Sequence, residues 1–305
     1  MGLNPAGVTK MKGYFNNTKP FGQLLTLVGL VVLFFIVGTS IMSIAMVGGA
    51  EITDVRFQWL FQAVTQLLTF FLPALIFASL FTDSVRGSLQ LDFHAEKWLM
   101  AIASIVILIC LMPFSDWLAQ INDGMHLPER FTELELQLRE RSAMSQEIVV
   151  GMLSQQGVAA LIVNLLVIAL VPALCEEFFF RGALQHFFCR WMKNHHVAII
   201  ATAAVFSLMH GDIFGFLPRF MLGILLGYLF HYSRSILVNV VVHFFNNALI
   251  VILYYLYYQG TTNSNIAEDV HVSGIVVVVG IAFALVIFYA LFLRQKSEKQ
   301  SSNQA

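Results

Sequence analysis

Long apolar runs separated by short polar stretches dominate the chain. A membrane-spanning helix needs about 20 mostly apolar residues to cross a hydrocarbon core about 30 Å thick. Eight runs are candidates, and the fifth and sixth are so short that we expect them to be tilted or broken around the turn at 211–218. The predicted spans are 22–48, 57–81, 97–115, 157–190, 197–211, 215–232, 236–258 and 273–293.

These runs predict an all-α, polytopic integral membrane protein, with about eight transmembrane helices bundled around an intramembrane polar site. The composition agrees, because 58% of the residues are hydrophobic and only 11% are charged, which is too apolar for a soluble domain. The net charge of −1 gives no reason to expect nucleic acid, so the expected surroundings are membrane lipid. The predicted parts are an N-terminal segment at 1–21, membrane helices with an extramembrane loop at 22–156, a core at 157–258, a last loop and helix at 259–293, and a polar tail at 294–305.

The lysine and arginine residues predict the orientation. Eight spans place both termini on one side of the membrane, and 12 of the 17 Lys and Arg residues then lie on that side. Because cytoplasmic loops carry an excess of Lys and Arg, we expect both termini in the cytoplasm. In a bacterium this membrane would be the plasma (inner) membrane.

The longest polar stretch, 116–147, is acidic and lies on the opposite side in this arrangement. Within it, residues 128–142 predict an amphipathic helix with Phe131, Leu134 and Leu138 on one face. Such a helix is either a solvated connector, or a segment that lies on the membrane surface or caps the site.

Two adjacent glutamates, Glu176 and Glu177, interrupt the fourth apolar run, and Pro172 one turn earlier predicts a kink. A charge at the bilayer centre costs about 2.5–3.5 kcal/mol, so paired carboxylates there need a reason. Glu177 and Arg181 are four residues apart and can form an ion pair on one helix face. Glu176 points about 100° away, and a carboxylate in an apolar pocket is a usable base. The alternative is that all three form a buried structural network.

Polar residues also interrupt two later runs. His210 ends the fifth run, where it could polarise a water, bind a metal or bond to a backbone carbonyl. Asn239, His243 and Asn247 recur every four residues and form one polar stripe on a helix. His243 and Asn247 can donate hydrogen bonds to one point, as an oxyanion hole requires, whereas Asn239 is also typical of polar contacts between helices.

Other positions indicate packing. Gly223 and Gly227 form a Gly-x-x-x-Gly pair, which is typical of a closely packed helix face. Three glutamines on one face of the second span either join helices or line a cavity: Gln58, Gln62 and Gln66. The remaining histidines give no prediction, among them His186, His195 and His231.

Three motifs occur in one order: Glu176-Glu177-x-x-x-Arg181-Gly182, Phe206-x-x-x-His210 and His243-x-x-x-Asn247. In this order they resemble the CPBP intramembrane proteases, also called the CAAX-protease and bacteriocin-processing (Abi) family. The resemblance covers 157–258, about a third of the chain, and implies a helical membrane peptidase core. It implies that Glu176 and His210 activate the attacking water and that His243 and Asn247 stabilise the oxyanion. Glu177 and Arg181 would support the site.

The resemblance leaves the cofactor open. The family was first regarded as metal-dependent, and a metal-free mechanism that depends on glutamate has also been proposed. A zinc ion would take Glu176, His210 and His243 as ligands and leave one position for water. We favour the metal-free mechanism, because a zinc-bound imidazole nitrogen of His243 could no longer donate to an oxyanion.

The expected substrate is a membrane-anchored or lipidated peptide. Two other functions stay open on the sequence: a non-catalytic protein of the same fold that acts in bacteriocin immunity or partner binding, and a transporter. Transport would need charged residues along a path through several spans, and the first and third spans are nearly free of them.

Overall fold

The computed structural model describes residues 15, 18–82, 84–91, 96–261 and 273–302, and every regular element within them is helical. The all-α, polytopic fold is therefore confirmed. Seven helices are long and apolar enough to cross a membrane, close to the eight expected. They are Pro20–Val47, Val55–Phe81, Lys97–Asp123, Val158–Met192, Ile213–Ser233, Ile236–Tyr258 and Gly274–Leu291.

The eighth expected span, 197–211, is the shorter helix α10 (His195–Met209). Its 15 residues rise about 22 Å, less than the hydrocarbon thickness. α10 packs along α11 (Phe216–Ser233), and the Gly-x-x-x-Gly pair permits the close approach. A Cβ on Gly223 would lie 3.0 Å from the Cα of Ala203, and a Cβ on Gly227 would lie 2.7 Å from Cγ2 of Ile199. The predicted packing role of these glycines is confirmed.

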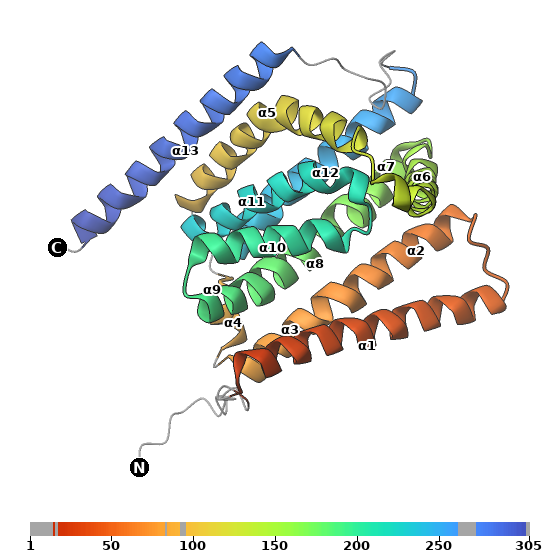
Figure 1. Ribbon diagram of the computed structural model, residues 1–305, viewed down its shortest axis with the longest axis horizontal. Helices are drawn as coiled ribbons and strands as arrows, with labels where there is room; N and C mark the ends of the chain where they lie inside the picture. The colour runs from red at the N-terminus through yellow and green to blue at the C-terminus, as the bar shows by residue number, and fades with distance from the viewer. Residues whose placement is uncertain (1–14, 16–17, 83, 92–95, 262–272, 303–305) are drawn as a thin grey trace.

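Most helices run back and forth along the longest axis of the molecule (Figure 1). The first turn of α1 (Pro20–Val47) and the last turn of α13 (Gly274–Ser302) lie at the same end, in line with the expectation that both termini are on one side. α1 packs on the second span, and α13 packs on α5 (Glu96–Asp123) at the opposite flank. α12 (Ile236–Tyr258) lies between them and contacts the helix that carries the glutamates.

The glutamate-bearing helix alternates between α-helical and π-helical turns. Its parts are α7 (Val158–Asn164), η3 (Leu165–Leu170), α8 (Val171–Glu177), η4 (Phe178–Gln185) and α9 (His186–Met192). The second span is similar, with α2 (Val55–Gln66), η1 (Leu67–Phe71) and α3 (Leu72–Phe81). Pro172 and Pro73 are each the second residue after a π-helical segment. The widened turn accommodates a residue that lacks an N–H, so the irregularity expected at Pro172 is a π-helical turn.

Two helices extend beyond their predicted ends. α5 continues to Asp123, although its span was predicted to end at 115, and α13 continues to Ser302 through most of the polar tail. Hydropathy marks where an apolar run ends, whereas the backbone hydrogen bonds of a helix continue through polar residues. A one-turn helix, α4 (Val85–Ser88), connects the second and third spans.

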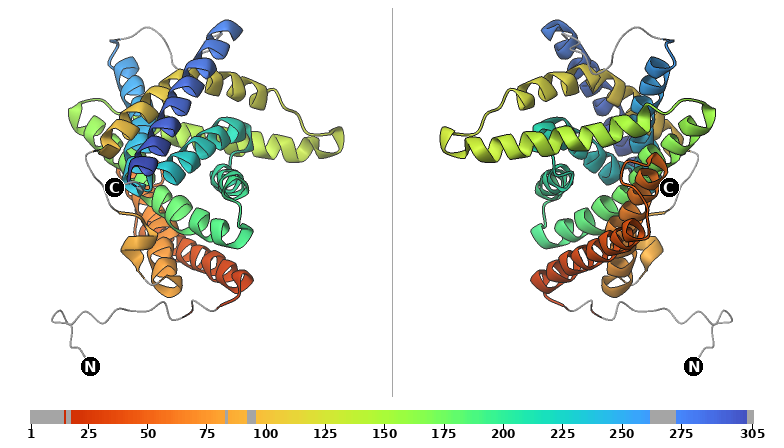
Figure 2. Two further views of the ribbon diagram at one scale, coloured as in Figure 1. Left: turned by 90° about the vertical axis from the view of Figure 1, so that its left-hand side faces the viewer. Right: turned by 90° about the vertical axis from the view of Figure 1, so that its right-hand side faces the viewer.

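The predicted loop at 116–147 is largely helical. After α5 and a short 3₁₀ turn, η2 (Glu129–Phe131), the helix α6 (Thr132–Leu153) crosses the end of the bundle opposite the termini (Figures 1 and 2). Phe131 and Leu134 on its expected apolar face are exposed, whereas Glu135 and Ser142 are buried against the protein. Two polar side chains of α6 therefore hold it to the bundle, while the apolar residues Phe131 and Leu134 remain exposed.

Aromatic side chains close the core around the glutamates. Phe178, Phe179 and Phe180 are all buried, so they fill space between helices. The ring of Phe180 lies 5.0 Å from the ring of Phe206 on α10, in an edge-to-face arrangement. Phe77 on α3 belongs to the same cluster. This packing surrounds the polar groups of α8 with apolar surface, which strengthens electrostatic interactions there.

Candidate active site

Glu177 is fully buried and accepts hydrogen bonds from its own helix and from α12. Its Oε1 accepts from Nη1 of Arg181 at 2.9 Å and from Nδ1 of His243 at 2.8 Å. Its Oε2 accepts from Nδ2 of Asn239 at 3.0 Å. The predicted ion pair between Glu177 and Arg181 is thus present. Since three donors occupy both oxygens, this carboxylate is held as an anion that fixes α8 against α12.

The second terminal nitrogen of the Arg181 guanidinium, Nη2, is also hydrogen-bonded. It donates to the carbonyl of Gly223 at 3.1 Å, and one turn later Nε2 of Gln185 donates to the carbonyl of Gly227 at 3.0 Å. Two side chains one turn apart on η4 therefore meet two carbonyls one turn apart on α11. The absence of a Cβ on both glycines lets the helices approach closely enough for these bonds.

Glu176 lies in different surroundings, and only 5% of its surface is exposed. Its Oε1 accepts from Nε2 of Gln66 on α2 at 3.1 Å. Its Oε2 is buried without a hydrogen-bond partner among the described residues and lies 3.8 Å from Nε2 of His243. Oε1 of Gln66 is buried and unpartnered as well. Unsatisfied acceptors of this kind are the groups that a buried water bridges.

The ring of His243 is oriented by Glu177. A carboxylate only accepts hydrogen bonds, so the proton of the neutral ring is assigned to Nδ1, which points at Glu177. Nε2, which faces Glu176, is then an acceptor, and it becomes a donor only when the ring is protonated. This geometry allows His243 to accept a proton or a water hydrogen before it can donate one.

His210 is exposed at the end of α10, and Nδ1 lies 2.8 Å from the carbonyl of Phe206. The Phe206 ring lies 4.9 Å from the ring of His210 and 5.9 Å from that of His243, and so contacts both histidines. Asn247 is half-buried one turn beyond His243, and its Oδ1 accepts from Nδ2 of Asn246 at 3.0 Å. The structure therefore brings Glu176, Glu177, Arg181 and His243 together, and it leaves His210 and Asn247 without a direct hydrogen bond to them.

The zinc ligands considered from the sequence, Glu176, His210 and His243, are not gathered at one point among the described residues. Among the described residues, no group of three His, Cys, Asp or Glu side chains is placed to hold a metal ion. Nδ1 of His243 and Nδ1 of His210 each lie against an oxygen acceptor, so Nε2 is the nitrogen of each ring that could bind a metal. Glu176 and His243 supply only two donors, fewer than the three that a catalytic zinc takes from the protein.

The turn that follows His210 is fixed by Asp212. Its Oδ2 accepts from Nη2 of Arg219 at 2.7 Å, and its Oδ1 accepts from Oγ of Ser142 on α6 at 3.1 Å. Burial raises the pKa of Asp212, but the hydrogen bonds and the charge of Arg219 outweigh this effect and hold the pKa below its usual value. α6 is thus tied to the turn that carries His210.

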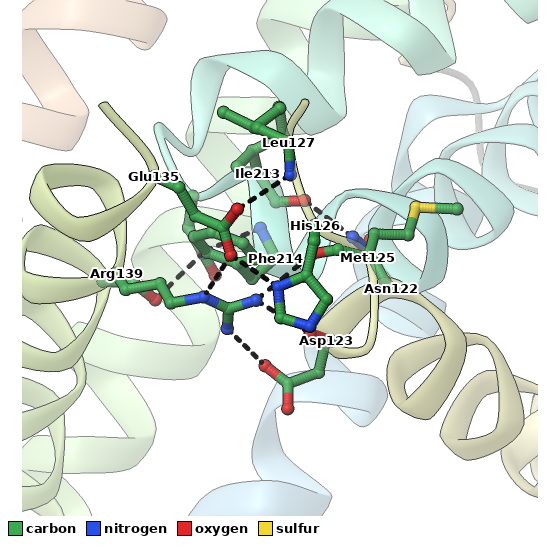
Figure 3. Close-up of polar contacts among 11 residues, drawn as sticks. Asn122, Asp123, Met125, His126, Leu127, Glu135, Arg139, Ile213 and Phe214 are labelled. Atoms are coloured by element: carbon green, nitrogen blue, oxygen red, sulfur yellow. Dashed lines mark hydrogen bonds and ion pairs between the residues drawn. The ribbon is translucent and has the colours of Figure 1, made fainter. Parts of the chain in front are cut away.

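A second polar cluster anchors α6 to the end of α5 (Figure 3). Glu135 accepts from Nδ1 of His126, the backbone N–H of Leu127 and Nε of Arg139, at 2.8, 2.8 and 3.0 Å. These bonds, led by His126, lower the pKa of Glu135 to about 2. The Arg139 guanidinium also lies 4.1 Å from the ring centroid of Phe214, in the same turn as Asp212. The cluster therefore positions α6 over the region beside the site.

The sequence does not assign a specific partner to three residues of this region. Gln66 is one of three glutamines on a face of the second span, and no spacing rule connects it with Glu176 on another helix. The spacing places Asn239 on the polar stripe with His243 but does not indicate Glu177 as its partner. For Asp212, the available signal is Arg219 seven residues later, which offers an ion pair.

The fold and this cluster define a multi-pass α-helical membrane protein with a buried carboxylate, imidazole and guanidinium site. Residues 158–249 match the family model described as "Type II CAAX prenyl endopeptidase Rce1-like". The match confirms the resemblance to CAAX proteases over about a third of the chain, and it supports a membrane protease of the CAAX endopeptidase type. No curated protein and no solved structure matched the chain.

Proposed function

We propose that the chain is an intramembrane endopeptidase that hydrolyses a peptide bond of a membrane-anchored or lipidated substrate near the bilayer. The observation that carries the proposal is the pair of Glu176 Oε2 and His243 Nε2, two acceptors 3.8 Å apart in an apolar surrounding. A water that donates one hydrogen to each would keep its lone pairs free to attack a carbonyl carbon.

In this mechanism Glu176 is the general base. It takes the proton of the water as the oxygen attacks the peptide carbonyl, and later delivers it to the leaving amine. Gln66 positions Glu176 through its bond to Oε1, so that Oε2 faces the water. Glu177 and Arg181 act as positioning residues, because Glu177 holds the ring of His243.

The developing oxyanion needs hydrogen-bond donors. We assign this role to Asn247 and His243, which lie one turn apart on one face of α12. Asn247 donates from its amide in either state of the ring. His243 donates from Nε2 when its ring has taken a proton from bulk water, because the proton of the attacking water goes to Glu176. His210 at the end of α10 would orient the water or the peptide when a substrate brings these groups together, because catalytic contacts are often long before substrate binds. The mechanism is proposed as metal-free.

The test is cleavage of a panel of lipidated peptides by the purified full chain in liposomes. We expect Glu176→Gln to abolish cleavage, whereas Glu147→Gln, an exposed glutamate on α6, cleaves like the wild type. A zinc chelator should leave the wild-type rate unchanged. Cleavage by Glu176→Gln at the wild-type rate would contradict the proposed base, and loss of wild-type cleavage with chelator would contradict the metal-free mechanism.

We also propose that both termini are cytoplasmic, and that in a bacterium the protein lies in the inner membrane. The support is the excess of Lys and Arg on that side and the common end of α1 and α13 (Figure 1). α6 would then lie on the outer surface. Labelling of single cysteines at Lys193 and Glu147 with an impermeant maleimide should modify only position 147 in intact cells.

A further inference from the structure

A recess lined by cationic groups lies where α9 turns into α10 and where α11 ends. These elements meet at the end of the bundle opposite α6 (Figure 1). Its volume is about 270 Å³. Its lining comes from η4, α9, α10 and α11 together with Gln90 of the connection between the second and third spans. None of the motif residues of the candidate active site lines it, so it is a separate feature.

The charged side chains that line the recess are all cationic among the described residues. Arg190 and Arg234 line it as exposed side chains, and among the described residues no carboxylate contributes to the lining. Three imidazoles join them, from His186, His195 and His231. The rings of His195 and His231 are stacked, with centroids 4.3 Å apart and planes 7° apart. Such a concentration of positive and protonatable groups favours an anion.

Two amides line the inner part of the recess, those of Gln185 and Gln90. Gln185 is only 2% exposed, and its Nε2 is held by the carbonyl of Gly227, so its Oε1 is fixed in place. That Oε1 and Oε1 of Gln90 are both buried without a hydrogen-bond partner among the described residues. Both oxygens are shielded from the recess, so the groups that a ligand would meet are the arginines and the imidazoles, which favour an anionic group.

We propose that this recess binds the phosphate of a lipid head group or of a free phosphate ester. The recess lies at an end of the transmembrane helices, where lipid head groups are found, and basic pockets between helices bind such groups. The phosphate would contact Arg190 and Arg234. A phospholipid of the surrounding leaflet or a free phosphate ester has this chemistry. The site is independent of the proposed peptidase activity.

The first arm of the test measures lipid retention. The full chain is reconstituted in phosphatidylcholine nanodiscs that contain phosphatidylglycerol, and the lipid that remains bound after detergent extraction is measured by native mass spectrometry. We expect the wild type to retain phosphatidylglycerol preferentially and Arg234→Gln to lower this preference about five-fold. Lys193→Gln removes one charge at the same end from an exposed residue outside the recess, and it should keep the preference.

The second arm uses soluble glycerol 3-phosphate. If it raises the melting temperature of the detergent-solubilised wild type but not of Arg234→Gln, while the lipid arm shows no preference, the phosphate site stands and its ligand is a free ester. Equal loss of lipid preference in Arg234→Gln and Lys193→Gln would overturn the proposal, since it would indicate diffuse surface charge. The absence of both a lipid preference and an effect of glycerol 3-phosphate on the wild type would also overturn it.

Discussion

Two isosteric substitutions at adjacent positions should differ strongly in how much they destabilise the fold. Glu177→Gln removes the charge that faces the buried guanidinium of Arg181. It also places an amide N–H₂ either against the donor of Asn239 or against those of His243 and Arg181. Breaking a buried pair by removing one partner costs about 3–5 kcal/mol, which is a factor of roughly 10² to 10⁴ in the unfolding equilibrium. Glu176→Gln removes a carboxylate with a single hydrogen bond, so its cost should stay within about 1 kcal/mol.

The assay is reversible unfolding of the purified chain in mixed micelles with increasing dodecyl sulfate, followed by far-ultraviolet circular dichroism. The double variant Glu177→Gln with Arg181→Gln completes a cycle. In the double variant, Arg181→Gln removes the charge that Glu177→Gln leaves unpaired. The double variant should therefore lose less stability than the sum of the losses in the two single variants, by more than about 0.5 kcal/mol. Additive costs, or equal destabilisation by Glu176→Gln and Glu177→Gln, would refute the reasoning that Glu177 is the structural carboxylate.

Three further predictions test other contacts. Gln66→Leu removes the donor to Glu176 and should lower kcat of peptide cleavage about ten-fold with little change in KM, and an unchanged kcat would contradict its positioning role. Gly227→Ala places a Cβ 2.7 Å from Cγ2 of Ile199 and should destabilise the fold by about 1–3 kcal/mol in the same unfolding assay. Glu135 has a pKa lowered to about 2, so the stability that its carboxylate contributes should be full above pH 4.5 and be lost as the pH falls toward 2. The difference in melting temperature between wild type and Glu135→Gln should therefore shrink over that range, and a constant difference would show that the charge is not responsible.

Much of the fold could be predicted because membrane insertion imposes a length and an apolarity on each span. Local spacing within one helix was equally informative: the pairing of Glu177 with Arg181 and the close packing at Gly223 and Gly227 follow from neighbours three or four residues apart. The seven long spans lie close to the predicted ranges, whereas the ends of α5 and α13 do not, because polar residues do not end a helix.

Contacts between helices could not be read in the same way. The bond from Gln66 to Glu176 joins residues 110 positions apart, and no local rule fixes which face of α2 meets α8. The separation of His210 from the carboxylates also depends on where α10 ends and on the Phe206 ring beside it. The orientation of the His243 ring follows only from the contact of its Nδ1 with Glu177, which the sequence does not reveal.

The π-helical segment η3 determines which side chains of the glutamate-bearing helix point toward α2. Asn164 and Glu176 both contact α2, Asn164 through Trp59 and Glu176 through Gln66. On an uninterrupted α-helix, twelve residues leave these two side chains about 120° out of phase. η3 lies between them, and a widened turn that absorbs one residue reduces the mismatch to about 20°. Trp59 and Gln66 are already in phase on α2, seven residues apart, so this extra residue decides that the carboxylate of Glu176, rather than an apolar neighbour, faces the second span.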